Sequence, residues 1–319
     1  MVLIDPFGRA VTSLRISLTD SCNLHCIYCD MEGMERIDRI DRMEASDRLM
    51  RAEEVAEIVR IASKLGMTKI KLTGGEPLLR EDIVEVVSKV ASNPFVEEVS
   101  MVTNGVLLAQ KAHDLAKAGL RRVNVNLASI DPEVYRFVTG GSLERVVEGL
   151  REAIKAGLSP VKLNMVVLKG INDQSIPAML DFCSSLGTSL QLIELHHISG
   201  IGKSEFYESY HVDISSFEDY LTARAVKVER RLDLQNRPRY LLENGVQVEL
   251  VKYSHNSQFC LRCPRLRVTS DGKLKPCLMR NDNLVDILTP LRNGASEEDL
   301  VKLFEKAVSL RRPYFTTGS

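Results

Sequence analysis

The sequence predicts an α/β protein with a parallel sheet, followed by a smaller C-terminal domain, and three observations support this prediction. Short β-branched runs alternate with amphipathic helical patterns from residue 14 to about residue 196. Several helical patterns end at a glycine suited to a left-handed cap. After residue 200 the pattern changes to hairpins. Alternating β and α units form parallel sheets, and the six units counted here are too few for a complete eight-stranded barrel.

Six β-branched runs are the predicted strands, and amphipathic helices lie between them. The strands are Leu14 to Leu18, Lys69 to Thr73, Val96 to Thr103, Arg122 to Leu127, Val161 to Leu168 and Ser189 to Leu195. Two clear helices run from Glu53 to Leu65 and from Leu143 to Ala156. The predicted glycine caps are Gly66, Gly119, Gly157 and Gly187.

Two turn dipeptides define hairpins in the C-terminal part. Asn244-Gly245 joins residues 239–242 to residues 246–251. Asp271-Gly272 joins residues 266–269 to residues 273–277. We therefore expect two domains, residues 1–230 and residues 231–319.

Composition restricts the class of protein. The chain has 319 residues, is 44% hydrophobic and carries a formal net charge of -1, which argues against a nucleic-acid binder. Six of its seven cysteines fall in two tight triplets, which favours a reducing compartment. Charges interrupt the N-terminus where a signal peptide is apolar, and no apolar run approaches membrane-spanning length. We expect a soluble cytoplasmic protein with no membrane partner.

The first triplet, Cys22, Cys26 and Cys29, has the spacing C-x3-C-x2-C and directly follows the first predicted strand. Three thiolates within eight residues indicate a metal site. A [4Fe-4S] cluster usually takes four cysteines, so three would leave one iron open to a small molecule. The alternative is zinc, for which His25 would complete a set of three cysteines and one histidine.

The second triplet, Cys260, Cys263 and Cys277, has the spacing C-x2-C-x13-C and lies near His255. Its spacing alone leaves zinc and iron–sulfur equally open. The remaining cysteine, Cys183, is predicted to be a small buried hydrophobic residue.

The first triplet, with Tyr28 before its last cysteine, resembles the signature of the radical S-adenosylmethionine (SAM) enzymes. The run from Phe259 to Leu278 resembles the GTP 3′,8-cyclase family, which acts first in molybdenum-cofactor (molybdopterin) biosynthesis. Further matching motifs, in order along nearly the whole chain, are Asp5-Pro-Phe-Gly-Arg9, Leu14-Arg15-Ile16-Ser17, Lys71-Leu-Thr-Gly-Gly-Glu-Pro77, Thr103-Asn104-Gly105, Lys162-Leu-Asn164 and Gly170-Ile-Asn172. The resemblance implies an open, TIM-like partial (β/α)6 barrel with its site at the C-terminal strand ends, and a smaller C-terminal domain that carries a second [4Fe-4S] cluster.

The resemblance also implies roles in binding SAM. The open iron of the cluster on the first triplet would bind the amino and carboxylate groups of SAM. Gly74, Gly75 and Glu76 form the turn that would hold the SAM amino group, and the backbone of Tyr28 would lie near the adenine. Other positions that contact SAM in the family fall at Asn126 and His196. The alternative without a binding role is that Gly74-Gly75 is only a strand-to-helix turn.

Five cations lie in or beside predicted strands: Arg15, Lys71, Lys162, Arg265 and Arg267. Charges inside a barrel are costly unless an anion pairs with them, and arginine forks suit phosphate oxygens. Each cation alone is more typical of a surface charge at a strand end. Together, at family positions, they indicate a triphosphate site, and Leu266 belongs to the same predicted substrate-binding run.

By resemblance, the reduced N-terminal cluster cleaves SAM, and the resulting 5′-deoxyadenosyl radical takes the 3′ hydrogen of GTP. The C3′ radical then attacks C8 of guanine, held by the second cluster. Reduction and protonation of the resulting nucleobase radical give (8S)-3′,8-cyclo-7,8-dihydroguanosine 5′-triphosphate. A separate cyclic pyranopterin monophosphate synthase would use this product. An electron donor would be needed, and the chain would be a monomer or a homodimer.

The chain departs from the family pattern at several places. A substrate-binding threonine is replaced by Val102 and a phosphate-contacting arginine by Gln191, while Asn126 and His196 replace a serine and a methionine that contact SAM. Many family members end in Gly-Gly, whereas this chain ends in Gly318-Ser319. Either this branch lacks that tail, or Gly318 alone serves in its place, or the last residues are a cloning remnant.

Two other functions stay open at this point. One is a radical SAM enzyme with an auxiliary cluster that acts on a peptide, and the other is a zinc-stabilised binding module without radical chemistry. Residues 30 to 51 carry many charges without a clean period, and we favour a solvated connection over a segment that covers the site.

Overall fold

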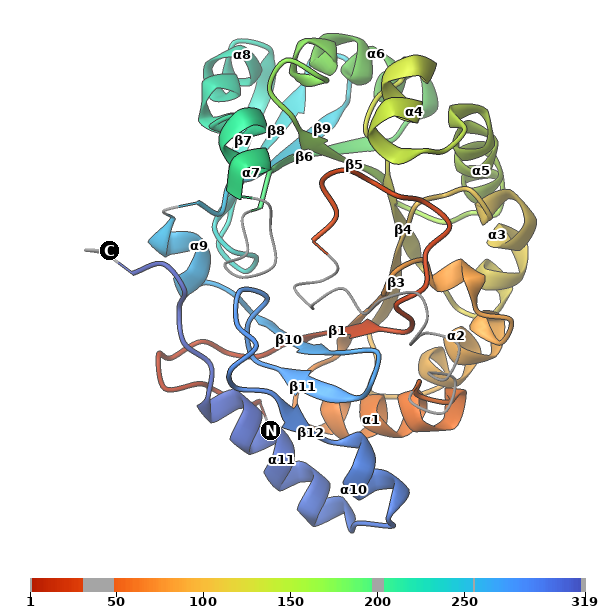
Figure 1. Cartoon of the computed structure of the whole chain (residues 1–319), viewed down its shortest axis with the longest axis vertical. Helices are drawn as coiled ribbons and strands as arrows, with labels where there is room; N and C mark the ends of the chain where they lie inside the picture. The colour runs from red at the N-terminus through yellow and green to blue at the C-terminus, as the bar shows by residue number, and fades with distance from the viewer. Residues whose placement is uncertain (1, 31–48, 197–203, 255, 317–319) are drawn as a thin grey trace.

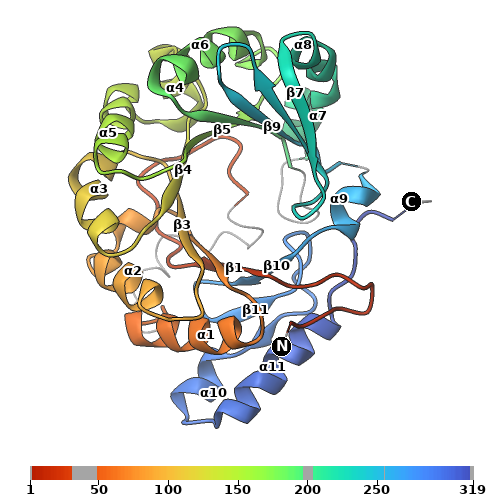
Figure 2. The same cartoon turned by 180° about the vertical axis from the view of Figure 1, so that it is seen from behind.

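The computed structural model describes residues 2–30, 49–196, 204–254 and 256–316. Within these residues, twelve strands form one curved sheet that wraps around a central space, and helices cover its outer face (Figure 1). The same arrangement is visible from behind in Figure 2. The predicted open partial barrel is confirmed, since six βα units form the middle of this sheet.

All six predicted N-terminal strands are present within two residues of their predicted ends, and neighbours pair in parallel. They are β1 (Ser13–Ser17), β2 (Lys69–Thr73), β3 (Glu98–Thr103), β4 (Arg122–Asn126), β5 (Val161–Val167) and β6 (Ser189–Glu194). Parallel strands need crossover connections, and the helices between them supply these.

In the described part of the chain, six helices cover the outer face of these strands. They are α1 (Ala52–Lys64), α2 (Ile83–Ala91), α3 (Leu108–Lys117), α4 (Pro132–Thr139), α5 (Leu143–Lys155) and α6 (Ile176–Leu186). Two of them, α1 and α5, match the predicted helices Glu53 to Leu65 and Leu143 to Ala156 within one residue. The four predicted cap glycines all have positive φ, as a left-handed cap requires. Short 3-10 turns cover Pro77–Leu79, Asp173–Ser175 and Ile214–Phe217.

The C-terminal part extends the same sheet at both edges. Its helices are α7 (Ser204–Tyr210), α8 (Glu218–Thr222), α9 (Ser257–Leu261), α10 (Leu288–Arg292) and α11 (Glu297–Ser309). Its strands are β7 (Ala225–Arg231), β8 (Arg237–Leu242), β9 (Gln247–Val251), β10 (Arg265–Val268), β11 (Lys273–Lys275) and β12 (Val285–Asp286). Both predicted hairpins, β8–β9 and β10–β11, are confirmed as antiparallel pairs. Strand β9 then pairs in parallel with β6, and β10 pairs in parallel with β1.

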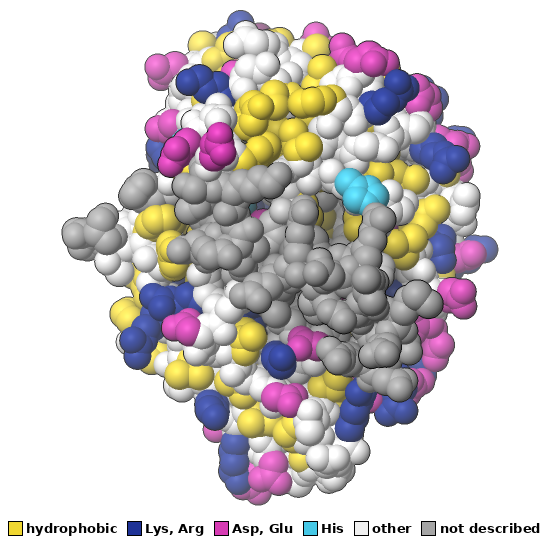
Figure 3. Space-filling view, in the orientation of Figure 1, with side chains coloured by type: hydrophobic (Ala, Val, Ile, Leu, Met, Phe, Trp, Pro, Cys, Tyr) yellow, Lys and Arg dark blue, Asp and Glu magenta, His cyan; other side chains and the backbone are white. Residues whose placement is uncertain are grey.

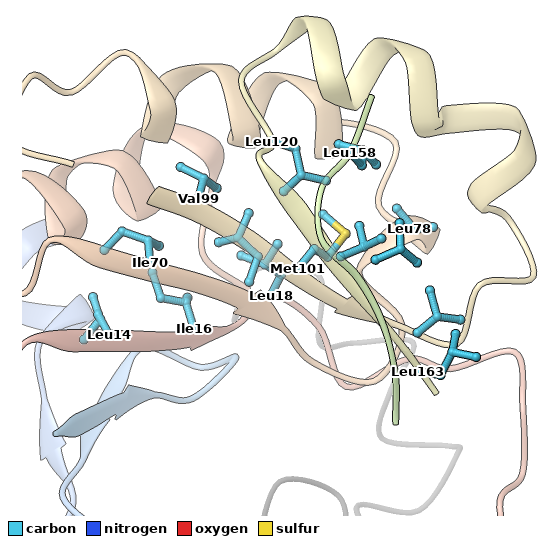
Figure 4. Close-up of a cluster of buried hydrophobic side chains, with 14 of the residues drawn as sticks. Leu14, Ile16, Leu18, Ile70, Leu78, Val99, Met101, Leu120, Leu158 and Leu163 are labelled. Carbon is cyan, nitrogen blue, oxygen red and sulfur yellow. The ribbon is translucent and has the colours of Figure 1, made fainter. Parts of the chain in front are cut away.

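The core lies between the sheet and the outer helices (Figure 4). Leu14 and Ile16 of β1 are fully buried there, as are Ile70 of β2 and Met101 of β3. Because side chains alternate along a strand, the residues between these apolar ones face the opposite side of the sheet, toward the central space. Arg15 of β1 is one of them.

The structure does not test several of the predictions made from the sequence. Most of residues 30–51, His255, Gly318 and Ser319 lie outside the described part of the chain. The domain boundary at residue 230 is untested, although the strands beyond it complete the same sheet. Of the helices described, none combines the length and the apolar character that crossing a membrane requires.

Candidate functional site

A cavity of about 1570 Å³ lies inside the curved sheet, and most of the predicted site residues line it. They are Arg15, Cys22, Cys26, Tyr28, Cys29, Lys71, Gly74, Gly75, Asn126, Lys162, His196, Cys260, Cys263, Arg265, Arg267 and Cys277. Two predicted residues do not line it. Glu76 is buried behind the cavity wall, and the side chain of Leu266 lies in the hydrophobic core. Strand alternation turns Leu266 away from its neighbours Arg265 and Arg267, so only its backbone could reach a ligand.

The cavity wall is strongly basic. Among the described residues that line it are twelve lysines and arginines but only four aspartates and glutamates. The outer surface differs, because Figure 3 shows basic and acidic side chains interspersed around this face. The chain as a whole is close to neutral. The excess positive charge is therefore concentrated where a bound molecule would be enclosed.

The first triplet occupies the loop after β1, and its three thiols influence one another. Burial raises the pKa of Cys26 to about 12, and the neighbouring Cys29 and Cys22 add to this effect. The sulfur of Cys22 accepts hydrogen bonds from the Leu24 amide at 3.5 Å and from Asn104 Nδ2 at 3.8 Å. A cationic metal centre stabilises thiolates and would therefore offset both the burial and the mutual repulsion that raise the pKa of Cys26.

The glycine turn after β2 packs directly against this loop. A Cβ atom on Gly74 would lie 2.5 Å from the Thr19 carbonyl oxygen, and one on Gly75 would lie 2.2 Å from the Ser21 carbonyl oxygen. Gly75 also donates a 2.6 Å hydrogen bond to Thr19. Both glycines therefore have a packing role beside the cysteine loop, whatever else they bind.

Glu76 joins this turn to the end of β3. Its carboxylate accepts hydrogen bonds from the Leu78 amide at 3.0 Å, Thr103 Oγ1 at 2.7 Å and the Asn104 amide at 2.7 Å. Burial nevertheless raises its pKa to about 7. Because Asn104 also contacts Cys22, Glu76 supports the first triplet from behind.

The other predicted SAM-contacting residues, Tyr28, His196 and Asn126, also line the cavity. Tyr28 is next to Cys29, and burial raises its pKa. The ring of His196 packs against Tyr253 with their centroids 4.0 Å apart. Asn126 Oδ1 accepts a hydrogen bond from Asn164 at 3.1 Å.

Adjacent strands align several of the predicted cations. Arg15 on β1 lies in register with Arg267 on β10 and with Lys71 on β2. Burial lowers the pKa of Lys71, and the charges of Arg122 and Arg15 lower it further. The pKa of Arg265 is also well below its usual range, through burial and repulsion from Arg237. Such mutual repulsion is relieved when an anion binds among the cations.

The sequence reasoning missed a carboxylate in this wall. Glu249 of β9 is 1% exposed and accepts hydrogen bonds from Lys162 at 3.0 Å, Gln191 at 2.5 Å and Arg231 at 3.2 Å. Burial opposes its ionisation, but the charges of Lys162 and Arg237 outweigh burial and lower its pKa. A glutamate inside the apolar run Val246 to Val251 was the signal that could have identified it.

The second triplet is held by both ends of the chain. Arg9 donates a 2.8 Å hydrogen bond to the carbonyl of Cys260, and Arg311 donates one to the carbonyl of Cys263. Asp5 pairs with Arg9 at 2.6 Å and with Arg311 at 2.9 Å. The Phe315 amide donates to the sulfur of Cys260 at 3.5 Å.

This triplet also lies among cations. Burial raises the pKa of Cys263, but the charges of Arg265 and Arg311 outweigh burial and lower it. Its sulfur accepts a hydrogen bond from Gln235 at 3.7 Å.

Cysteine thiols are the shared donors of both triplets. All seven cysteines are free thiols. Within the described residues, no three His, Cys, Asp or Glu side chains converge on one position that could hold a metal ion. A cubane cluster has no such requirement, because each cysteine binds a different iron. A zinc site is therefore not preformed in the described part of either triplet.

Comparisons with known proteins agree with this arrangement. The family model described as "Radical SAM superfamily" matches residues 16–183, and "Molybdenum Cofactor Synthesis C" matches residues 188–317. A protein of Thermococcus kodakarensis named "Probable GTP 3′,8-cyclase" is 48% identical over 98% of this chain and its own full length. A Pyrococcus horikoshii protein with the same name is 45% identical over the full length of both chains.

Solved structures with low sequence identity show the same fold. SuiB of Streptococcus suis bound to S-adenosylmethionine has a TM-score of 0.66 at 17% identity and aligns with 94% of this chain and 67% of its own. The protein anSMEcpe with bound AdoMet has a TM-score of 0.61 at 16% identity and aligns with 92% of this chain and 81% of its own.

Proposed function

The chain belongs to the GTP 3′,8-cyclase family of radical SAM enzymes, and from this membership we propose how its cavity carries out the reaction. The enzyme converts GTP to (8S)-3′,8-cyclo-7,8-dihydroguanosine 5′-triphosphate, the first step of molybdenum-cofactor biosynthesis. One observation carries the proposal. Two cysteine triplets and a basic wall all line a single cavity, so a cofactor-bound SAM and a polyphosphate could meet inside it.

The first triplet would hold the cluster that cleaves SAM. Three cysteines leave one iron free for a ligand. When bound and reduced, this [4Fe-4S] cluster supplies the electron that splits SAM and starts the radical chemistry. Asn104 and the Leu24 amide, which contact the sulfur of Cys22, keep the loop in position. Tyr28, Gly75 and His196 would then surround SAM.

The second triplet would hold an auxiliary [4Fe-4S] cluster beside the substrate. Its support is the set of free thiols around the cavity, together with the arginines that stabilise an anionic thiolate at Cys263. With three protein ligands, this cluster also keeps an open iron, to which the guanine would bind.

The basic wall would hold the triphosphate of GTP. Arg15, Lys71 and Arg267 lie in register across three strands, and Arg265 lies beside them. Lys162 is bound to Glu249 and can turn its ammonium toward a phosphate while remaining close to that carboxylate. Enclosure strengthens each of these ion pairs because water is excluded.

The remaining partners follow from the proposed reaction. A separate cyclic pyranopterin monophosphate synthase would consume the product, and an electron donor would reduce the clusters. The cytoplasm is the proposed compartment, because thiolate-bound clusters need a reducing environment. A monomer and a homodimer remain the two proposed assemblies.

The test is anaerobic reconstitution with iron and sulfide, followed by incubation with SAM, a reductant and each of the four nucleoside triphosphates. Mass spectrometry would detect 5′-deoxyadenosine and a cyclised nucleotide. We expect the cyclised product from GTP alone. SAM cleavage without a nucleotide product would favour a peptide substrate, and a protein that binds zinc but no iron would refute radical chemistry.

A further inference from the structure

Arg237 at the start of β8 lines the cavity but belongs to none of the predicted substrate contacts. It is 5% exposed, and its guanidinium donates a hydrogen bond to Gln235 Oε1. It also lies over the ring of Phe259, 5.5 Å from the centroid. Among the described residues, no acceptor reaches its Nε atom, which is buried. A buried guanidinium N–H without an acceptor is costly and indicates a missing partner.

Charges of both signs surround Arg237. Burial lowers its pKa to about 10, and repulsion from Arg231 and Arg15 acts in the same direction. Arg237 is in turn the charge that most lowers the pKa of Arg265. The charges of Glu249 and Cys263 act in the opposite direction, but Glu249 already accepts hydrogen bonds from Lys162 and Arg231. The charge of Arg237 is thus compensated only in part by the protein.

The backbone before Arg237 is strained in a way that fixes its position. Gln235 and Asn236 have φ of 59° and 54°, the left-handed region that residues other than glycine seldom adopt. Strain of this kind persists where the surrounding structure enforces it, often at functional sites. Here the Gln235 amide donates to the Arg262 carbonyl at 2.9 Å, and its side chain contacts the sulfur of Cys263. Arg237 is therefore anchored to the second triplet rather than free to swing into solvent.

We propose that Arg237 is a further ligand of the substrate's polyphosphate group, positioned by Gln235 beside the second triplet. The proposal rests on the proposed function and adds to it a residue that the family resemblance did not supply. A phosphate oxygen would accept the hydrogen bond from Nε and would neutralise the repulsion among Arg237, Arg265 and Arg15. Arginine suits this position because its planar fork can hold Gln235 and a phosphate at the same time.

The experiment measures binding of GTP, inorganic tripolyphosphate and guanosine to the anaerobically reconstituted protein by calorimetry. Arg237→Met should weaken GTP and tripolyphosphate binding by about tenfold or more, the loss expected for one charge-assisted hydrogen bond, and leave guanosine binding unchanged. Arg237→Lys, which keeps the charge but not the fork, should lie between Arg237→Met and the unmodified protein. SAM cleavage without GTP should be the same in all three proteins.

The matched control is Arg239→Met, two residues along the same strand. Arg239 also lines the cavity but is paired with Glu229, so its substitution should leave tripolyphosphate affinity unchanged. Equal affinity of Arg237→Met and the unmodified protein for tripolyphosphate would overturn the inference. So would an equal loss of guanosine and GTP binding, which would mean a structural role.

Because tripolyphosphate can bind but cannot be cyclised, its affinity tests the role of Arg237 independently of the proposed reaction. If GTP gives no cyclised product while tripolyphosphate binding still depends on Arg237, the proposed reaction fails and the anion site stands. If GTP is cyclised and Arg237→Met binds both polyphosphates normally, the reaction stands and the inference fails.

Discussion

The two cysteine triplets line one cavity but differ in the charges around them: the pKa values of Cys260 and Cys277 are raised by burial, as in the first triplet, whereas that of Cys263 is lowered. Around the first triplet, the raised pKa of Cys26 comes from burial and from other thiolates, and the buried carboxyl of Glu76 adds to the effect at Cys22. Around the second, the charges of Arg265 and Arg311 lower the pKa of Cys263 despite its burial. Two sets of three cysteines therefore provide two different sites.

This difference matches the charges of the two proposed ligands. SAM carries a positive sulfonium, which an environment poor in cations tolerates, whereas GTP carries a polyphosphate that needs cations. An enclosed cavity strengthens both preferences because the local dielectric is low. We infer that charge, rather than shape alone, directs each ligand to its end of the cavity.

The largest effect is expected from Cys26→Ala, which changes the first triplet alone. Loss of one of three thiolate ligands should abolish SAM cleavage, a fall of about a thousandfold or more, because the cluster supplies the electron. The iron content should fall by about half while the second cluster remains. Production of 5′-deoxyadenosine and iron per chain are the measurements.

Cys183→Ala is the control, since Cys183 is buried in α6 away from both triplets. SAM cleavage that survives in Cys26→Ala would contradict the assignment.

The second triplet should depend on Arg311 for its stability. Arg311 is 1% exposed and joins Asp5 to the Cys263 carbonyl, so Arg311→Met should lower the free energy of unfolding by about 3 kcal/mol. Guanidinium unfolding of the cluster-free protein would measure this. Arg312→Met alters the neighbouring exposed residue and should change the value by less than about 0.5 kcal/mol. An Arg311→Met protein as stable as the unmodified chain would show that the chain ends do not brace this triplet.

Arg265→Ala should weaken GTP binding without preventing SAM cleavage. It removes a phosphate contact, so GTP binding should weaken by about 10- to 100-fold while uncoupled SAM cleavage continues. Calorimetry and 5′-deoxyadenosine production measure the two properties. Arg262→Ala, at an exposed arginine of the same segment, should leave both unchanged. Equal loss of the two activities in Arg265→Ala would remove the proposed division of roles.

The smallest expected effect is a pH dependence of the folding stability, caused by Glu76 behind the first triplet. Glu76 has an ordinary pKa of 4.5 that burial raises to about 7, so between these values the folded state binds the proton more tightly than the unfolded state. Its contribution to stability is therefore present below about pH 4.5 and is lost as the pH rises through about 7. Glu76→Gln cannot ionise, so relative to the unmodified protein it should gain about 1 to 3 kcal/mol between pH 5 and pH 8.

Urea unfolding of the cluster-free proteins at both pH values would test this prediction. Glu53→Gln is a suitable control because that carboxylate is exposed on α1. A constant stability difference between Glu76→Gln and the unmodified protein would show that Glu76 titrates normally.

Much of the fold could be predicted because its signals are local. Buried parallel strands are short β-branched runs, and cap glycines mark where each helix ends, so strand limits were predicted within two residues. The pairing of β10 with β1, and of β9 with β6, could not be predicted in the same way. Each pairing joins segments far apart in the chain, and nothing in either segment alone records its neighbour.

The candidate site was predicted unevenly for a related reason. Motif residues such as Cys22 and Lys71 were identified from their spacing and family resemblance, whereas Glu249 and Arg237 were missed. Their importance depends on burial and on partners from other strands, which a single segment does not reveal. Gln191 illustrates this point, because its amide bridges Asn124 and Glu249 where the family has an arginine.

The contacts of the second triplet also set an order of assembly. The backbone of the first cysteine loop bonds to Val138 and Thr139, which follow it by little more than a hundred residues. The second triplet needs Arg9 from the beginning of the chain and Arg311 from near its end. As a ribosome releases the chain, the backbone bonds of the first cysteine loop to α4 can therefore form early, whereas the hydrogen bond from Ser270 to Asp20 in the same loop needs the C-terminal part. Both ends of the cavity are therefore completed only after the C-terminal strands have been made, since β10 must also pair with β1.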